Sequence, residues 1–253
     1  MKNTLIILNC SHDCGIDQKG ISELNLIELN VDCNKKIENV NHMKNTLKIL
    51  NCSSDSGINQ NGILELNLIV LCASDNEKIK NVNHMKNTLE KLDCGYECEI
   101  DQNGISELNL IELCAIGNKR IKNVNQMKRT LKILDCGYDS GIDQNGISEL
   151  NLIELYADDN EKIKNVTHMK KILKILYCNY ESGIDQSSIS KLNLIELNAD
   201  HNEKIINVNH MKKTLKKLNC SYGCGIDQNG IAELNLIELC AIGNNKIQDK
   251  IEL

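Results

Sequence analysis

The sequence contains no proline, no phenylalanine and no tryptophan, and its six tyrosines are its only aromatic residues. A packed interior therefore has to be assembled from Leu, Ile, Val, Met, Ala and Cys, which fill the apolar positions of the chain. Apolar residues make up 41% and charged residues 25% of the 253 residues, as in ordinary globular proteins. The length is enough for one large domain or two ordinary ones.

Further absences narrow the possible partners and compartment. The net charge is −6, and no cluster of Lys and Arg provides the footprint that nucleic acid requires. No apolar run approaches the ~20 residues of a membrane span. The amino terminus opens directly into a repeat, without the apolar region of a signal peptide. Because thirteen cysteines occur without a secretion signal, we expect a reducing compartment and a cytoplasmic protein, with no nucleic-acid or membrane partner.

What the sequence does contain is an internal repeat. The pair Met-Lys recurs at 1, 43, 85, 127, 169 and 211, a strict period of 42 residues. Each 42-residue unit divides into two 21-residue coils, and we number the positions of a coil from Leu5, so that the next coil begins 21 residues later. Leu stands at positions 1 and 4 and apolar residues at positions 6 and 12, as in 131–142 and 152–163. We predict a single domain over residues 1–253, with about twelve coils in six units.

The two kinds of coil alternate and are named here after the residues that mark them. Cys coils carry Cys at position 6, and Asn coils carry Asn at position 9. A period of 2 places positions 4 and 6 inside and positions 3 and 5 outside a short strand. One coil cannot bury its own apolar face, so stacking should produce a continuous parallel sheet and a shared core.

The return leg of a Cys coil begins with a polar stretch, Asp143-Gln144-Asn145-Gly146. We interpret this stretch as a polar turn, with Gly146 at a position that needs φ > 0. The three residues that follow Ile147 are sufficient for one helical or 3₁₀ turn only.

The pattern Leu-x-x-Leu-x-Cys/Ala-x-x-Asn-x-x-Ile resembles the leucine-rich-repeat superfamily over essentially the whole chain. This resemblance implies an arc-shaped repeat solenoid with a parallel β-sheet on the concave side and short turns or 3₁₀ segments on the convex side. It also implies a concave sheet that binds other proteins, and no catalytic activity. This kind of short repeat is similar to those of the Asn/Ile/Lys-rich repeat proteins of giant DNA viruses and some protists. A viral origin would place the protein in a host cytoplasm. The Cys coils depart from the pattern, with Asp, Glu or Gly at position 9.

No column of residues predicts a catalytic, cofactor or metal site. The position-6 cysteines are two coils apart, roughly 9.6 Å by strand spacing, whereas a disulfide needs Cα atoms within about 7 Å. We therefore expect reduced core thiols. Four histidines recur on the return leg at the same spacing, and His12 and His201 stand isolated. We expect the position-9 asparagines to be buried and to bind backbone groups at the bend after the strand.

Outward positions remain as candidates for binding. Position 3 holds Glu in most Asn coils and Ile in most Cys coils, and position 8 of several Cys coils is Tyr, a residue favoured at interfaces. The candidate partner-binding residues are Tyr96, Tyr138, Tyr180, Glu112, Glu154, Ile133 and Ile175. Duplication of the repeat could also have copied these residues without selection for binding.

Two functions follow from these patterns. The first is a non-enzymatic interaction scaffold that binds a protein of unknown identity through its concave sheet. The alternative is a structural element that associates with itself end to end, because strand edges at both ends lack a polar cap. An enzyme is disfavoured, since no column has the neighbours that catalysis requires.

Overall fold

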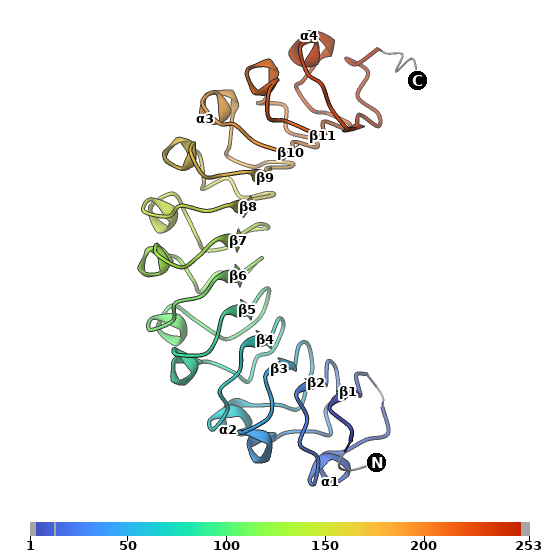
Figure 1. The fold of residues 1–253 in the computed structure, drawn as a ribbon, viewed down its shortest axis with the longest axis vertical. Coiled ribbons are helices and arrows are strands. Elements are labelled where there is room, and N and C mark those ends of the chain that lie inside the picture. Colours follow the sequence, from blue (N-terminus) through green and yellow to red (C-terminus); the bar gives the residue numbers. More distant parts are fainter. Residues whose placement is uncertain (1–3, 13, 249–253) are drawn as a thin grey trace.

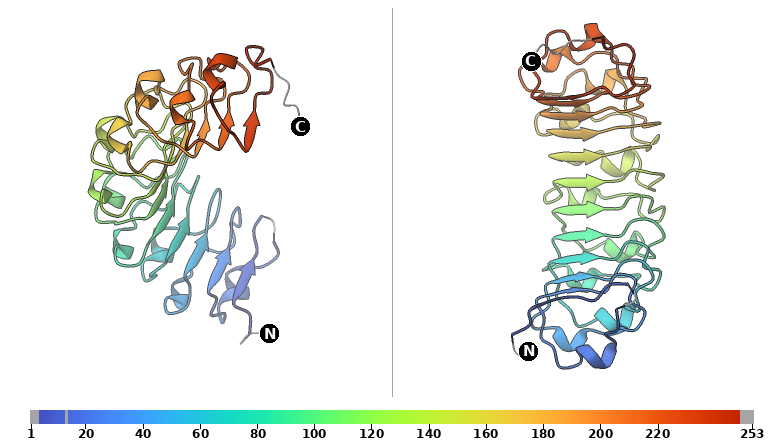
Figure 2. Two further views of the ribbon diagram at one scale, coloured as in Figure 1. Left: turned by 45° about the horizontal axis from the view of Figure 1, so that its top comes forward. Right: turned by 90° about the vertical axis from the view of Figure 1, so that its right-hand side faces the viewer.

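The computed structural model describes residues 4–12 and 14–248, which form an arc (Figure 1). Strands β1 to β12 line the inner side of the arc, and short helices lie along its outer side (Figure 1). The strands form one parallel sheet in sequential order and stack along the length of the arc (Figure 2). The predicted solenoid with a concave parallel sheet and short convex turns is confirmed.

Each strand occupies positions 3 to 5 of its coil and pairs in register with the strand 21 residues later, as Ile133 does with Glu154. The strands are β1 (Ile7–Asn9), β2 (Glu28–Asn30), β3 (Ile49–Asn51), β4 (Val70–Cys72), β5 (Lys91–Asp93), β6 (Glu112–Cys114), β7 (Ile133–Asp135), β8 (Glu154–Tyr156), β9 (Ile175–Tyr177), β10 (Glu196–Asn198), β11 (Lys217–Asn219) and β12 (Glu238–Cys240).

The return legs contain single turns of helix, as the short spacing predicts. Over residues 4–12 and 14–248, four of these turns are α-helical, namely α1 (Gln18–Ile21), α2 (Gln60–Ile63), α3 (Gln186–Ile189) and α4 (Gln228–Ile231). Seven are 3₁₀ turns, namely η1 (Asn41–Met43), η2 (Asn83–Met85), η3 (Asn103–Ile105), η4 (Asn125–Met127), η5 (Asn145–Ile147), η6 (Thr167–Met169) and η7 (Asn209–Met211).

The reason for glycine at position 16 of the Cys coils differs from the prediction. Gly146 does not adopt a positive φ. A Cβ at this residue would lie 2.1 Å from the carbonyl oxygen of Lys122 in the preceding coil. Glycine is required because two backbones approach closely, and not because the turn is left-handed.

The interior is built from the positions that the period of 2 assigns to it. Leu134 and Cys136, at positions 4 and 6, are fully buried. All six position-6 cysteines are buried, and all thirteen cysteines of the chain are free thiols. Desolvation is the main cause that raises the pKa of Cys10 to about 11 and of Cys220 to about 12. The predicted burial of the position-6 cysteine column is therefore confirmed.

The position-9 asparagines are buried and bind backbone groups of the preceding coil, as expected. The Nδ2 of Asn118 donates to the carbonyls of Cys94 at 2.7 Å and Ile100 at 3.1 Å. Its Oδ1 accepts from the backbone N–H of Arg120 at 2.9 Å. The same three bonds are made by Asn34, Asn76, Asn160, Asn202 and Asn244.

Amide side chains also connect the coils on the convex side, which the sequence analysis did not anticipate. The Nε2 of Gln144 donates to the carbonyl of Asn165 at 2.9 Å. Its Oε1 accepts from the backbone N–H groups of Lys164 at 2.9 Å and Asn165 at 2.8 Å. Gln144 is thus a connection between coils rather than only a polar turn residue.

We expect Asn118→Ala to lower the free energy of unfolding by roughly 1–3 kcal/mol, because two buried carbonyls and the N–H groups of Arg120 and Ile121 lose their partner. The matched control is Asn123→Ala, since Asn123 is exposed and its Oδ1 accepts one bond from Asn125 at 2.9 Å. Urea denaturation of both variants measures the difference. Equal midpoints would contradict a structural role for the buried column.

Candidate interaction surface: the concave sheet and the position-8 turns

Four of the seven candidate residues form one row across the concave sheet. Glu112 pairs with Ile133, Ile133 with Glu154, and Glu154 with Ile175 on successive parallel strands. All four side chains are half-buried, because they stand at position 3 and face away from the core. The row alternates acidic and apolar side chains over four adjacent strands.

The acidic members of this row are held by their neighbours. Glu112 forms an ion pair with Lys91, with 2.7 Å between Oε2 and Nζ. Glu154 accepts a hydrogen bond of 2.9 Å from the hydroxyl of Tyr156. These contacts restrict the carboxylates before any partner arrives.

Tyr156 and Tyr177 belong to the concave surface and were missed by the sequence analysis. Their rings meet edge to face with centroids 4.9 Å apart. The hydroxyl of Tyr177 donates to Glu196 at 2.6 Å. Both residues stand at position 5, which the period of 2 already assigns to the outward face, so the signal was present in the pattern.

A shallow hollow of about 330 Å³ lies on the concave sheet beside these residues. Its lining includes Glu112, Ile133 and Glu154 of the candidate row together with Asp135 and Tyr156. The pKa of Asp135 is raised to about 6, mainly by desolvation and less by the carboxylates of Asp158 and Asp93, whereas the hydrogen bond from the N–H of Gly137 lowers it. The hollow therefore combines apolar area with carboxylates that lie close to one another.

The other three candidates lie elsewhere than predicted. Tyr96, Tyr138 and Tyr180 stand on the turns that follow the strands, not on the concave strands themselves. Their side chains are exposed. The displacement has a backbone cause, because φ is 53° at Tyr96, 48° at Tyr138 and 53° at Tyr180, so the chain leaves the extended conformation before position 8.

The left-handed conformation is a property of position 8 in every coil that the structure describes. Two of these residues are glycine, Gly117 and Gly243, and ten carry a side chain. The ten are His12, Cys33, Ser54, Asp75, Tyr96, Tyr138, Asp159, Tyr180, His201 and Tyr222. Residues at position 8 of consecutive coils lie side by side along the side of the sheet at which the strands end. We call this column the turn ridge.

Part of the turn ridge is a stack of aromatic rings. His201 lies between Tyr180 and Tyr222, with centroids 5.0 Å and 4.8 Å from its own. His201 therefore has close aromatic neighbours, whereas the sequence predicted that it would be isolated. A hollow of about 570 Å³ beside the stack is lined by Tyr138, Tyr180 and His201, by the carboxylates of Asp159, Glu181 and Glu203, and by Lys204 and Gly223.

His12 is not isolated either. Its ring lies beside Asp32 and Cys33 of the next coil, and their potential metal-ligating atoms are all within 4.8 Å of one another. The signal that could have revealed this group is a comparison of position 8 between consecutive coils. The prediction from sequence relied on positions at which one residue type recurs, and such residues are two coils apart.

Comparison with solved structures defines the class of the fold. A chain of the Rad7 and Elc1 complex from yeast is 15% identical, with a TM-score of 0.61, and the match covers 100% of this chain and 80% of that chain. The functional domain of InlJ from Listeria monocytogenes, described as including a cysteine ladder, is 22% identical, with a TM-score of 0.63. That match covers 98% of this chain and 55% of the Listeria chain.

Both of these neighbours are leucine-rich-repeat proteins. The chain accordingly has the leucine-rich-repeat fold, and its described residues form twelve parallel strands in one open sheet. No protein-family model and no curated protein matches the sequence. Within the residues that the structure describes, no helix is long and apolar enough to span a membrane.

The raised pKa of Asp135 predicts how stability depends on pH. Because the pKa is about 6 in the folded state, above the usual Asp value of 3.8, the stability that this carboxyl contributes is present at low pH. That stability is lost as the pH rises through about 6. Asp135→Asn should raise the free energy of unfolding at pH 8 by roughly 2 kcal/mol, and the gain should vanish toward pH 4.

The substitution keeps the local hydrogen bond, because Asn198 at the same position accepts from the N–H two residues later at 3.2 Å, as Asp135 does. Asp139→Asn, which removes a charge from an exposed turn, is the control. Urea titrations at pH 4, 6 and 8 give the comparison. A gain that does not depend on pH would show that desolvation of Asp135 is not the cause.

Proposed function

We propose that this chain is a non-enzymatic protein-interaction scaffold that binds a basic segment of a partner across its concave sheet. The observation that carries the proposal is the row Glu112, Ile133, Glu154 and Ile175, which presents alternating charge and apolar area on four paired strands. The hollow of about 330 Å³ beside this row offers a place for one side chain of the partner.

Charge complementarity favours a basic partner. Positions 3, 5 and 7 of the six coils from β5 to β10 hold seven carboxylates and a single cation, Lys91. The carboxylates are Asp93, Glu112, Asp135, Glu154, Asp158, Glu196 and Asp200. Arg and Lys side chains entering this surface would offset the repulsion from Asp158 and Asp93, which adds to the effect of desolvation in raising the pKa of Asp135.

The turn ridge supplies a second contact in this proposal. Tyr96, Tyr138 and Tyr180 are exposed aromatic side chains, and the hollow beside Tyr138 and Tyr180 also contains carboxylates. An aromatic face next to a carboxylate is suited to a guanidinium or ammonium group through cation–π and ionic attraction. A partner that extends past the ends of the strands would contact both the concave sheet and the turn ridge.

Two further observations support a binding role over catalysis. Three of the seven concave carboxylates, Glu112, Glu154 and Glu196, are engaged with Lys91 or a tyrosine hydroxyl. Burial raises the pKa of the position-6 thiols, which disfavours the nucleophilic thiolate. Leucine-rich-repeat neighbours are typically interaction scaffolds, and the yeast neighbour comes from a protein–protein complex.

The first test selects binders without assuming a partner. Peptides selected from a random library against the 253-residue chain should be enriched in Arg and Lys, and their affinity should fall with salt. Ile133→Ala combined with Glu154→Gln should weaken the selected peptides about thirtyfold, the ~2 kcal/mol of a central interface residue. Calorimetry measures the affinity.

Glu149→Gln is the matched control, because Glu149 loses the same charge on the exposed return leg. Tyr138→Ala tests the turn ridge separately, and we expect a smaller loss than for the concave pair. Acidic selected peptides, or an equal loss with Glu149→Gln, would contradict the concave site.

End-to-end self-association is the alternative function that a specific observation favours. Ile6 and Ile7 at the edge strand β1 are 51% and 56% exposed, and Ile237 beside β12 is 81% exposed. The outer edges of β1 and β12 have no partner strand in the described sheet. Apolar side chains next to an open strand edge favour pairing with another copy.

Light scattering across a concentration series distinguishes the two functions. If the chain self-associates, the measured mass should increase with protein concentration up to tens of micromolar. Ile237→Lys should reduce this increase. A constant monomer mass over this range would exclude the alternative and leave the concave site unaffected.

A further inference from the structure

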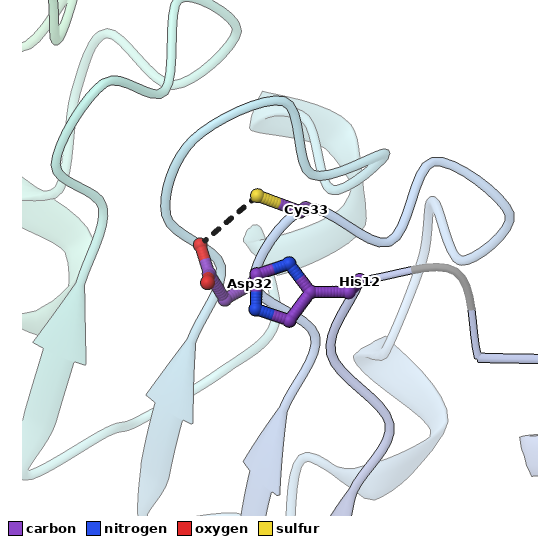
Figure 3. A group of neighbouring side chains, drawn as sticks. All are labelled: His12, Asp32 and Cys33. Carbon is purple, nitrogen blue, oxygen red and sulfur yellow. Dashed lines mark hydrogen bonds between the residues drawn. The ribbon is translucent and has the colours of Figure 1, made fainter.

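We propose that His12, Asp32 and Cys33 form a binding site for Zn²⁺ or a chemically similar divalent transition-metal ion. A nitrogen of His12, a carboxylate oxygen of Asp32 and the Sγ of Cys33 all lie within 4.8 Å of one another. Figure 3 shows the ring of His12 beside the two side chains of the next turn, with a contact of 3.7 Å from the Sγ of Cys33 to Asp32. No metal site was predicted from the sequence, in which His12 stands isolated.

The fold holds the three ligands together through the backbone. His12 and Cys33 occupy position 8 of consecutive coils and share the left-handed conformation, with φ of 56° and 58°. The N–H of His12 donates to the carbonyl of Asp32 at 2.7 Å, which fixes the two turns against each other. The arrangement therefore follows from the stacking of coils and does not depend on a chance approach of long side chains.

The ligand types match the chemistry of zinc. Imidazole nitrogen, thiolate sulfur and carboxylate oxygen are its three usual protein ligands, and three of them leave a fourth tetrahedral position for water. Ligand atoms around tetrahedral zinc are separated by roughly 3.5 Å, so the group has to contract by about 1 Å. Because His12 is exposed and the other two side chains are half-buried, rotation of the side chains can provide this movement and an ion can enter.

Charge balance also favours a divalent ion. Binding breaks the S–H bond of Cys33, releases that proton to solvent and forms a metal–sulfur bond. A thiolate, a carboxylate and a neutral imidazole together neutralise a charge of +2. The affinity should accordingly increase with pH as the proton becomes easier to release.

The same chain provides a natural contrast. His201 and Asp200 occupy positions 8 and 7 of one coil, and the His201 Nδ1 lies 3.0 Å from the Asp200 Oδ1. The neighbours of His201 in the turn ridge are Tyr180 and Tyr222, so no thiol completes a ligand set there. Only the group at the first two coils combines three ligand types among the residues that the structure describes.

The position of the site indicates what a bound ion would do. His12 belongs to the coil of β1, an edge strand of the sheet, and Asp32 and Cys33 belong to the coil of β2. A shared ion would cross-link the edge coil to its neighbour. Because an edge coil has one neighbour instead of two, such a link stabilises the part of the stack that opens most easily.

The test uses Co²⁺ as a spectroscopic substitute for Zn²⁺ on the reduced full chain. We expect one Co²⁺ per chain, a thiolate-to-cobalt charge-transfer band, and displacement of Co²⁺ by Zn²⁺. Cys33→Ser should remove the band, and His12→Ala should weaken binding at least ~10-fold. Zn²⁺ should also slow hydrogen exchange in the coil of β1.

His201→Ala and Cys14→Ser are the matched controls, since they remove the same residue types outside the group. Both should bind Co²⁺ like the unmodified chain. Urea midpoints measured without metal establish that each variant is folded. No uptake by the unmodified chain, a band that persists in Cys33→Ser, or an equal loss in His201→Ala would overturn the proposal.

Discussion

The interaction on which the solenoid depends is the hydrogen bond from a buried asparagine to a carbonyl of the preceding coil. A strand of three residues leaves most of each coil without a regular hydrogen-bonding partner. Where the chain bends away from the sheet, carbonyls such as those of Cys94 and Ile100 are inside the stack and out of reach of water. The amide of Asn118 satisfies both. Without this donor, the bend would leave unpaired carbonyls in an interior made mostly of apolar side chains.

The same solution is repeated on the outside of the arc with longer side chains. Gln144 bridges to the following coil with three hydrogen bonds. Similarly, the Nδ2 of Asn125 donates to the carbonyl of Asn145 in the next coil at 2.7 Å. The abundance of amide residues thus has a structural reason, since amides carry both a donor and an acceptor. A chain without proline or large aromatic rings gains rigidity from these cross-connections between coils.

Sequence reasoning predicted the parts of this fold that depend on side-chain period. The burial of Leu134 and Cys136 and the role of Asn118 follow from position alone. The turn ridge could not be predicted in the same way, because a left-handed residue is normally signalled by glycine and ten of its twelve residues have a side chain. For that reason Tyr138 was assigned to the concave sheet, although its backbone turns outward first.

The candidate site shows the same division. Ile133 and Glu154 were placed correctly in one row, because register follows from the repeat length. Tyr156 was overlooked because its position-5 column mixes Asn, Cys, Asp and Tyr, and tyrosine is a minority type in it. Contacts between different residue types of consecutive coils, such as His12 with Cys33, become apparent only when residues at the same position of consecutive coils are compared.

The alternation of coils also fixes how such an array can change in length. Each position-9 asparagine belongs to an Asn coil and serves the bend of the Cys coil before it, so the two kinds of coil are complementary halves. Removing or inserting one coil of 21 residues would place two coils of the same kind side by side. Two adjacent Cys coils would leave a bend without its amide, while two adjacent Asn coils would bring a bend of a different sequence to the amide. The unit of insertion, deletion or transplantation into another array is therefore the pair of 42 residues.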